Sequence, residues 1–349
     1  MKSKNYSENI IKVFKKDGFV LSEPDVLLDS DYIIERSGEN FRKIMLTFED
    51  DTGKSMCLRP DLTVASCIKY LKDNSKANSK IYYSGQAYRR SKSLNKIVNY
   101  QLGLEIFGSK NKSVDDLKVL RTITNSINNI KIKNITIKVG DVSLFKQLIE
   151  SLKIPERWRM RLKRHFWRPQ YFEDLLSRLE TNSDVDPSTV ELDKKKFFEM
   201  KSIDQNNEVA NRKFSEIISR FDRKIKDPRS FKENKKTVKI LREFLKINCS
   251  INKLEKTLNN FIYKNQLNKN VFKDLSSLKN LSRLNSKITF STNFGRDIEY
   301  YSGVVFEIYN SSKKEIARGG RYDGLLKSLG SKKNISAVGA AINLNNLKT

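Results

Sequence analysis

Two β-rich stretches of this chain are separated by a long helical stretch, and this arrangement constrains the fold more than any other feature. Residues 1–150 and 285–349 contain alternating and apolar segments typical of strands, whereas residues 155–284 contain charged helical segments and no convincing strand. Because the strands of one sheet share one core, we expect the first and last stretches to form a single discontinuous α+β domain. Residues 155–284 are then an inserted helical domain.

Local patterns predict several strands in the discontinuous domain. An alternating segment at 41–48 and a short segment at 55–58 flank a turn at 50–53, which predicts an antiparallel hairpin. Apolar segments at 81–88 and 98–107 predict two further strands.

No part of the sequence is typical of a secreted or membrane protein. Met1 to Lys16 is charged and amphipathic, unlike a signal peptide. No stretch approaches the roughly 20 consecutive apolar residues that a membrane-spanning helix needs. We therefore expect a soluble, cytoplasmic protein without a membrane partner.

The cysteines and the single histidine do not form a metal-binding pattern. Cys57, Cys67 and Cys249 are isolated from one another, and His165 is the only histidine. No Ser, Cys or carboxylate is spaced to form a catalytic triad with His165, so we interpret this residue as structural or interfacial. We expect no metal ion, no cofactor and no catalytic residue.

The net charge has two interpretations. The 349-residue chain contains 68 Lys and Arg residues against 41 Asp and Glu, a formal net charge of +27. Clustered cations bind nucleic-acid phosphates, which would indicate an RNA-binding protein. The lysines are instead spread along the whole chain among acidic residues, as expected from an AT-rich coding sequence. We favour this compositional drift and expect no specific nucleic-acid partner, only general attraction to acidic partners.

The predicted strand at 99–108 has one polar face. Because side chains alternate along a strand, Gln101, Gly103 and Glu105 share a face. Two polar side chains separated by a glycine suit a ligand-binding surface, since the glycine lets a ligand approach the backbone. From this strand alone, a solvated outer face is the simpler interpretation.

Two other segments favour a ligand site. Residues 58–63 place Asp61 and Thr63 at a strand-to-helix junction, where ligands often meet backbone amides. Residues 294–303 place Arg296 shortly before Tyr300 and Tyr301. The carboxylates of Asp61 and Glu105 suit an ammonium group, and the Arg296 guanidinium suits a carboxylate. Two carboxylates in one pocket therefore favour a ligand with a positively charged amino group.

Five segments, in this order, resemble histidyl-tRNA synthetases and the paralogous family of ATP phosphoribosyltransferase regulatory subunits. They are Leu58 to Thr63, Tyr82 to Arg89, Gln101 to Gly108, Arg296 to Phe306 and Gly319 to Leu325. The resemblance implies a class II synthetase-like antiparallel sheet flanked by helices, self-pairing around Pro24 and a histidine-binding pocket. By motif position, the pocket residues are Asp61, Thr63, Arg89, Gln101, Glu105, Arg296, Tyr300 and Tyr301.

Departures from the synthetase motifs indicate which of the two families is matched. Synthetases carry an adenine-contacting glutamate two residues after the position of Arg89, where this chain has Ser91, and a phosphate-clamping arginine where it has Asn346. Neither replacement supplies the missing charge. The chain ends at Thr349, so we also expect no anticodon-binding domain.

The resemblance therefore implies a non-catalytic regulatory subunit rather than an enzyme. Its expected partners are a short catalytic subunit of ATP phosphoribosyltransferase, a second copy of itself within a hetero-oligomer, and L-histidine as a feedback effector in the first step of histidine biosynthesis. The alternative is a free-standing synthetase paralogue with residual amino-acid-activating or protein-modifying activity. An RNA-binding module, which rests on charge alone, is the third hypothesis.

Overall fold

The computed structural model divides into two compact units. The sheet unit comprises Met1–Leu144, Ile247–Asn259 and Phe272–Thr349, and the helical unit comprises Phe145–Lys246 and Asn260–Val271. The structure describes residues 2–37, 39–73, 78–91, 97–181, 195–196, 198–199, 208–209, 212–213, 215–216, 218–219, 231–284, 286–296 and 300–347.

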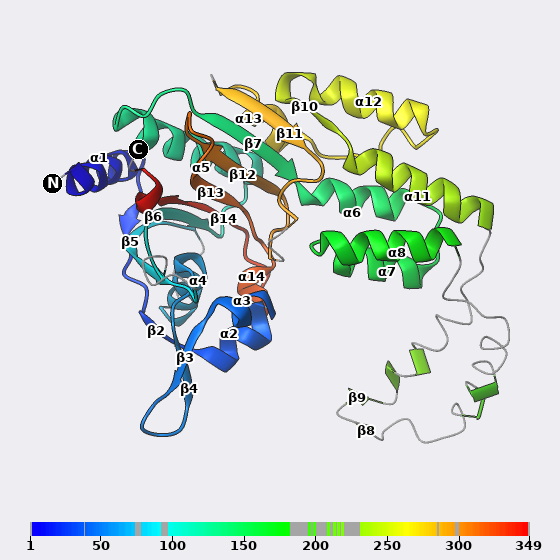
Figure 1. Ribbon diagram of the computed structural model, residues 1–349, viewed down its shortest axis with the longest axis horizontal. Helices are drawn as coiled ribbons and strands as arrows, with labels where there is room; N and C mark the ends of the chain where they lie inside the picture. Colours follow the sequence, from blue (N-terminus) through cyan, green and yellow to red (C-terminus); the bar gives the residue numbers. More distant parts are fainter. Residues whose placement is uncertain are drawn as a thin grey trace. The chain divides into compact units, whose positions relative to one another are not determined.

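A nine-stranded sheet is the centre of the sheet unit (Figure 1). Its order is β1-β5-β6-β14-β13-β12-β7-β11-β10. The pairs β1–β5 and β7–β11 are parallel and the other pairs are antiparallel, so the sheet is mixed around a long antiparallel centre. The strands are β1 (Val20–Leu21), β5 (Ser79–Tyr88), β6 (Val98–Phe107), β7 (Thr136–Asp141), β10 (Asn248–Ser250), β11 (Lys287–Ser291), β12 (Val304–Tyr309), β13 (Glu315–Arg321) and β14 (Ala337–Asn343).

Amphipathic helices pack on this sheet. The helix α5 (Lys112–Asn129) buries Val119, Leu120, Ile123 and Ile127, whose three- and four-residue spacing forms one apolar face. The other helices of this unit are α1 (Lys2–Lys16), α2 (Ser30–Ser37), α3 (Glu39–Ile44), α4 (Leu62–Lys72), α13 (Ser276–Leu281) and α14 (Leu325–Ser328).

A second, three-stranded sheet contains the predicted hairpin. Strands β3 (Leu46–Glu49) and β4 (Ser55–Leu58) pair antiparallel, as predicted, and β2 (Leu27–Asp29) pairs with the other edge of β4. The prediction of strand from residue 41 is wrong, because helix α3 extends to Ile44.

The helical unit has an aromatic core. Phe145 at the start of this unit stacks on Phe166 at 3.7 Å between ring centroids and meets Phe172 edge-on at 5.4 Å. Phe244 approaches both Phe145 and Phe261. Its main helices are α7 (Glu156–His165), α8 (Pro169–Thr181) and α11 (Phe231–Leu245), while α6 (Val142–Ser151) and α12 (Leu254–Lys264) continue from the sheet unit.

The boundaries of the predicted insertion differ from those of the helical unit. Residues 247–259 and 272–284 belong to the sheet unit, because β10 pairs with β11 and α13 packs on α5. The expectation of no strand between 155 and 284 is also wrong. Besides β10, this range contains the short pair β8 (Glu208–Val209) and β9 (Arg212–Lys213). None of the helices in the described ranges is long and apolar enough to cross a membrane.

Candidate functional site

A cavity of about 250 Å³ lies in the sheet unit, at the strand-rich segments that the sequence motifs occupy. This volume suits a small metabolite, since pockets for drug-sized ligands begin at roughly 300 Å³. Six of the eight predicted site residues line it, namely Asp61, Thr63, Arg89, Gln101, Tyr300 and Tyr301. The remaining lining residues are Glu315, Arg318, Gly319, Tyr322, Gly339, Ala340, Ala341 and Asn343.

The register of the sheet explains why Gln101 reaches the cavity. Gln101 pairs with Asn343 and Gly103 pairs with Ala341, so β6 and β14 present these side chains on one face. A Cβ atom at Gly103 would lie 2.3 Å from the Tyr83 ring, so this glycine leaves room for that ring. The predicted polar face of residues 101–105 is therefore the face that carries the site.

Asp61 and Arg89 form a pair on one wall of the cavity. One Asp61 oxygen caps helix α4 by accepting from the backbone N–H of Val64, at 3.1 Å. The other lies 3.5 Å from the Arg89 guanidinium, whose Nε donates to the carbonyl of Pro60 at 2.8 Å. Because the cap and the ion pair hold Asp61 from two sides, its carboxylate is fixed at the helix entrance.

Glu105 lies behind the cavity rather than in its lining. The side chain is fully buried and accepts from the hydroxyls of Thr63 at 2.8 Å, Tyr83 at 3.2 Å and Tyr322. Burial raises the pKa of this carboxyl to about 8, against the three hydroxyl donors, which lower it. The expectation that Glu105 grips an ammonium directly is not supported by this geometry. Its carboxyl instead orients Thr63 and Tyr322, which do line the cavity.

Arg296 is the second predicted residue that the cavity lining lacks. It is almost fully buried, and its guanidinium donates to the side-chain oxygen of Asn293 at 2.6 Å. The structure therefore places Arg296 beside its own loop, and its role toward a ligand carboxylate stays a prediction.

Three tyrosines form an aromatic wall. The Tyr300 ring meets those of Tyr301 and Tyr322 at steep angles, with centroids 5.1 and 5.9 Å apart. Burial, reinforced by the nearby Asp61, Tyr301 and Glu105, raises the pKa of Tyr300 well above its usual value. The Tyr300 hydroxyl therefore stays protonated at neutral pH and serves as a neutral hydrogen-bonding group.

The sequence did not predict the opposite wall. There, Arg318 forms ion pairs with the buried Glu307 and, at 3.0 Å, with Glu315. The Asn346 amide donates to the backbone carbonyl of Glu315 at 2.7 Å. The sequence contains no signal for the contact between Arg318 and Glu307, because it depends on the register of β13 against β12. Tyr322 had a signal, since it lies within the Gly319–Leu325 motif.

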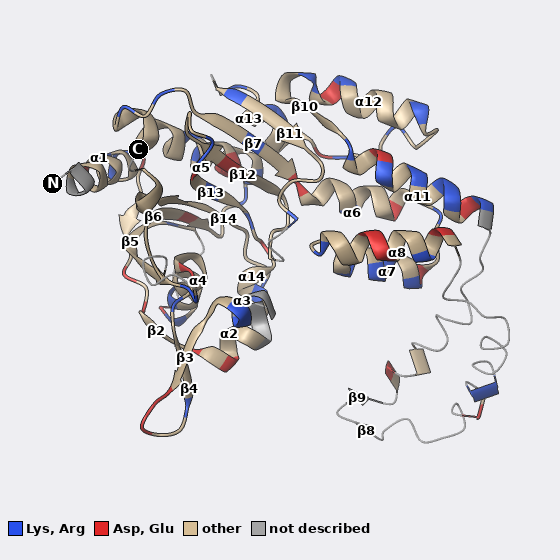
Figure 2. Ribbon diagram, viewed as in Figure 1, with Lys and Arg blue, Asp and Glu red and all other residues tan. Residues whose placement is uncertain are grey.

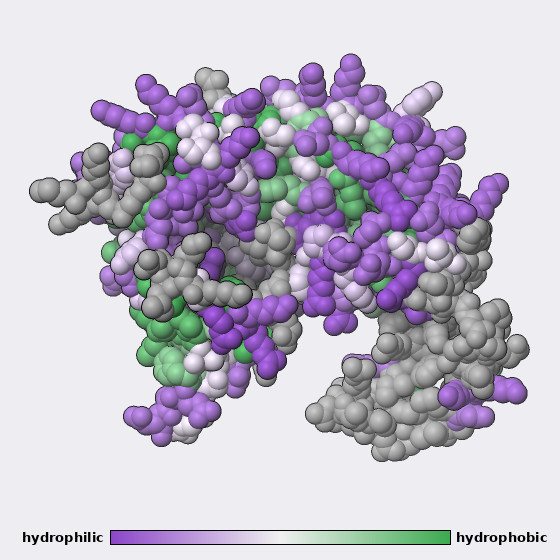
Figure 3. Space-filling view, viewed as in Figure 1, coloured by the Kyte–Doolittle hydropathy of each residue, from purple (hydrophilic) through white to green (hydrophobic). Residues whose placement is uncertain are grey.

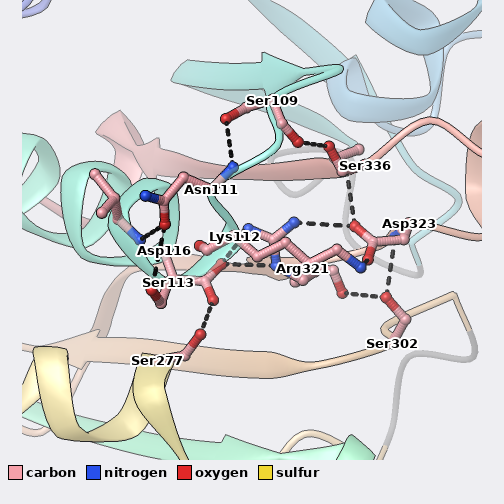
Figure 4. Close-up of polar contacts among 12 residues, drawn as sticks. Ser109, Asn111, Lys112, Ser113, Asp116, Ser277, Ser302, Arg321, Asp323 and Ser336 are labelled. Carbon is pink, nitrogen blue, oxygen red and sulfur yellow. Dashed lines mark hydrogen bonds and ion pairs between the residues drawn. The ribbon is translucent and has the colours of Figure 1, made fainter. Parts of the chain in front are cut away.

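A buried ionic network joins Arg321 at the end of β13 to helix α5 (Figure 4). Arg321 donates from Nε to Asp116 of α5 at 2.9 Å and from Nη1 to Asp323 at 3.0 Å. Ser277 donates to Asp116, and the backbone N–H of Asp323 donates to the Ser302 hydroxyl. These contacts hold both segments that carry cavity tyrosines, because Arg321 and Asp323 flank Tyr322 and Ser302 follows Tyr301.

The charges of the cavity compensate one another. Arg89 is paired with Asp61, and Arg318 with Glu307 and Glu315. Among the described lining residues, no arginine or lysine is left without a carboxylate partner. Such a lining suits a small zwitterion, which brings one charge of each sign, better than a polyanion. The described residues also contain no group of three His, Cys, Asp or Glu that could hold a metal ion.

The mixed sheet with flanking helices, together with a cavity assembled from its central strands, defines a class II synthetase-like protein. The family model described as Histidyl-tRNA synthetase matches residues 1–220 and 169–347. The chain therefore belongs to the histidyl-tRNA synthetase family, and the family resemblance predicted from the motifs is confirmed.

Known proteins agree with this assignment. Two curated relatives are named ATP phosphoribosyltransferase regulatory subunit. That of Allorhizobium ampelinum is 25% identical over 368 residues, covering 99% of this chain and 97% of the relative. That of Brucella anthropi is 26% identical over 351 residues, covering 94% and 92%.

Two solved structures share the fold. An ATP phosphoribosyltransferase regulatory subunit/histidyl-tRNA synthetase from Bacillus halodurans has a TM-score of 0.66 at 17% identity, covering 99% of this chain and 77% of that one. Histidyl-tRNA synthetase from Nostoc has a TM-score of 0.63 at 15% identity, covering 99% and 70%. The predicted class II synthetase-like fold is thus confirmed, with a mixed rather than wholly antiparallel sheet.

Proposed function

We propose that this chain is a non-catalytic regulatory subunit of ATP phosphoribosyltransferase. In this role it binds a short catalytic subunit, is required for that subunit's activity, and carries feedback control by histidine over the first step of histidine biosynthesis. The name shared by relatives that match almost the whole chain supports the role. The observation that carries it is the charge-compensated cavity, which suits an amino acid and has no described cation to spare for a triphosphate.

The alternative is a synthetase paralogue that still activates an amino acid. Its support is the family itself and the presence of Arg89 in the cavity lining. Against it, Asn346 uses its amide to hold the backbone of Glu315, and a neutral amide does not neutralise phosphate. Histidine-dependent exchange of pyrophosphate into ATP distinguishes the two. We expect none from the purified chain, and clear exchange would overturn the regulatory role in favour of the enzyme.

Histidine is the proposed ligand of the cavity. Its ammonium and carboxylate match the paired charges of Asp61 and Arg89, and its ring nitrogens match the polar side chains of Gln101 and the tyrosines. Calorimetric titration of Gln101→Leu tests this assignment. Losing one hydrogen bond costs about 0.5–1.5 kcal/mol, or roughly two- to tenfold in affinity. Tyr100→Phe is the matched control, because its half-exposed side chain precedes Gln101 on the other face of β6. If the two variants bind histidine with the same affinity, histidine is not the ligand of this cavity.

Self-pairing around Pro24 is the second proposed contact. The adjoining strands β1 and β2 expose large apolar side chains, with Val20 68%, Leu21 52% and Leu27 50% accessible. Figure 3 shows apolar surface around the small sheet of β2, β3 and β4. A contiguous apolar surface of this kind typically marks a protein interface, and a two-fold pair is the commonest arrangement. Sedimentation should show a dimer that Leu27→Glu shifts toward monomer. An unchanged dimer would place the contact elsewhere.

A further inference from the structure

One short segment of the helical unit differs in composition from the rest of this lysine-rich chain. The chain contains 47 lysines and 21 arginines, yet residues 157–168 contain five arginines and one lysine. The same twelve residues include both tryptophans and the only histidine. Where positive charge alone is needed, this chain has mostly lysine. The concentration of arginine therefore indicates a need for the guanidinium group itself, which is planar, binds carboxylates through two N–H groups and stacks on aromatic rings.

Helix α7 separates these residues onto distinct faces. Trp158, Leu162 and Phe166 are buried and face the core of the helical unit. Arg157, Arg161 and Arg164 follow one another at four- and three-residue spacing, which places them along another face. Arg168 follows one turn later, where its backbone N–H donates to the His165 carbonyl at 3.0 Å. We call Arg157, Arg161, Arg164 and Arg168 the arginine stripe; basic residues recur along α7 in Figure 2.

Part of the stripe has no acidic partner within the described chain. Arg164 and Arg168 are exposed and form no ion pair with any described acidic residue. In contrast, the other two cations of the segment are satisfied internally, since Arg159 pairs with Glu150 and Glu156 and Lys163 pairs with Glu150. Within the described residues, Arg164 and Arg168 are therefore the exposed stripe members that form no ion pair with an acidic residue.

Aromatic rings hold two of the guanidinium groups in place. The Arg161 guanidinium lies 4.6 Å from the Trp158 ring centroid, and that of Arg168 lies 4.2 Å from the Trp167 centroid. Stacking of this kind orients the planar group and reduces the entropy lost when it binds. Beside them, Met160 is 45% exposed. Arginine, tryptophan and methionine are among the residues enriched in protein–protein interfaces.

The positive charges of the stripe also affect the neighbouring imidazole of His165. The pKa of His165 is lowered by its partial burial and by the positive charges of Arg164, Arg168 and Arg161. Three positive charges therefore act on one imidazole, and an acidic partner surface would relieve their mutual repulsion.

We propose that the arginine stripe, with Met160 and Trp167, is the surface through which this chain docks onto acidic side chains of the catalytic subunit. This inference rests on the proposed function, because it takes its partner from there. A protein suits the stripe better than a nucleic acid. The Trp158 ring is buried and Arg168 covers one face of Trp167, which leaves the segment little tryptophan surface for stacking of a base.

A charge reversal with a matched control tests the docking surface. Arg164→Glu/Arg168→Glu removes the two unpaired cations, while Lys12→Glu/Lys16→Glu makes the same charge change at the same spacing on exposed positions of α1. Affinity for the purified catalytic subunit is measured by calorimetry for the native full-length chain and both variants. We expect at least a tenfold loss for the arginine variant and less than a twofold change for the lysine variant. The affinity of Arg164→Lys/Arg168→Lys should lie between those of the two reversal variants, because lysine keeps the positive charge but lacks the planar guanidinium group.

The outcomes separate this inference from the proposed function. If the native chain binds the catalytic subunit and the arginine and lysine reversals behave alike, the docking surface is overturned and the proposed function stands. If the native chain does not bind the catalytic subunit at all, the proposed function fails and the docking surface with it. Binding that disappears on ribonuclease treatment would overturn the docking surface in favour of a nucleic-acid contact. Equal unfolding midpoints of the variants exclude misfolding as the cause of a loss.

Discussion

At the scale of single residues, Glu105 is the least ordinary group of the candidate site. Its carboxyl is fully buried, accepts from three hydroxyls and has no described cation beside it. Because a buried charge is costly, the carboxyl stays protonated. Its raised pKa, about 8, has that cause. The folded protein therefore holds a proton that the unfolded chain releases near pH 4.5.

This proton makes stability depend on pH. Glu105 contributes stability that is fully present below pH 4.5 and is lost as the pH rises through about 8. Glu105→Gln is neutral throughout, so its free energy of unfolding minus that of the native chain should increase between pH 5 and 8, by up to about 1.4 kcal/mol per pH unit. Urea unfolding of both proteins at the two pH values measures this difference. Other buried acids, such as Asp141, are present in both proteins, so their contributions cancel in the difference between the two free energies of unfolding. A difference that is the same at both pH values would show that Glu105 is already ionised at pH 5.

The sequence predicted which face of the strand Glu105 lies on, but not that its side chain is fully buried. Alternation along residues 99–108 places Gln101 and Glu105 on one side, and both are there. Gln101 lines the cavity opposite Asn343, whereas Glu105 lies against Gly339 of β14, where the missing side chain leaves room for its carboxyl. The residue pattern of one strand does not show which side chains the neighbouring strand places against it. For the same reason, the ion pair between Arg318 and Glu307 of the neighbouring strand was not predicted.

At the scale of elements, close contact between strands β6 and β14 requires a glycine. A Cβ atom at Gly339 would lie 1.4 Å from Oε2 of Glu105 and 2.5 Å from the carbonyl oxygen of Leu104. We therefore expect Gly339→Ala to lower the free energy of unfolding by at least about 1–3 kcal/mol, the usual cost of overpacking a core. Gly324→Ala is the control, since nothing lies within 4 Å of its added Cβ, and it should stay within about 0.5 kcal/mol. Equal effects in denaturant titrations would mean that Glu105 moves aside freely.

The pair between Arg321 and Asp116 joins strand β13 to helix α5. Both side chains are buried, at 6% and 2% exposure, and Nη2 of Arg321 lies 2.7 Å from the carboxylate of Asp116. Arg321→Met leaves Asp116 buried without its cation, which should cost about 3–5 kcal/mol. Lys72→Met breaks the exposed 2.9 Å pair with Asp25 and should cost less than about 1 kcal/mol. Comparable losses in urea unfolding would argue that water reaches the buried pair.

The sequence predicted the elements that have strong local residue patterns. It did not predict the elements whose structure depends on contacts with residues distant in sequence. The segments at 81–88 and 98–107 became β5 and β6, because their apolar residues alone determine a buried strand. Residues 41–44 lie in α3 although the alternation along 41–48 predicted a strand there. Helix α13 and strand β10 look like part of the helical stretch in sequence, and only their packing on α5 and β11 assigns them to the sheet unit.

At the scale of the whole molecule, the chain keeps a synthetase-like fold around a cavity whose charges are balanced. The net charge of +27 does not extend to the described cavity lining, where each arginine has a carboxylate partner. The proposed regulatory role needs only that histidine and the catalytic subunit each favour one of two arrangements of the complex. It requires no bond-making step in this chain.

Reconstituted phosphoribosyl transfer to ATP tests that central claim most directly. The rate is measured for the catalytic subunit alone, for this chain alone, and for the two together across a histidine titration. We predict little activity for the catalytic subunit alone, none for this chain, a large increase for the mixture, and a fall in the mixture's rate as histidine rises. A catalytic subunit whose rate is the same with and without this chain would contradict the account.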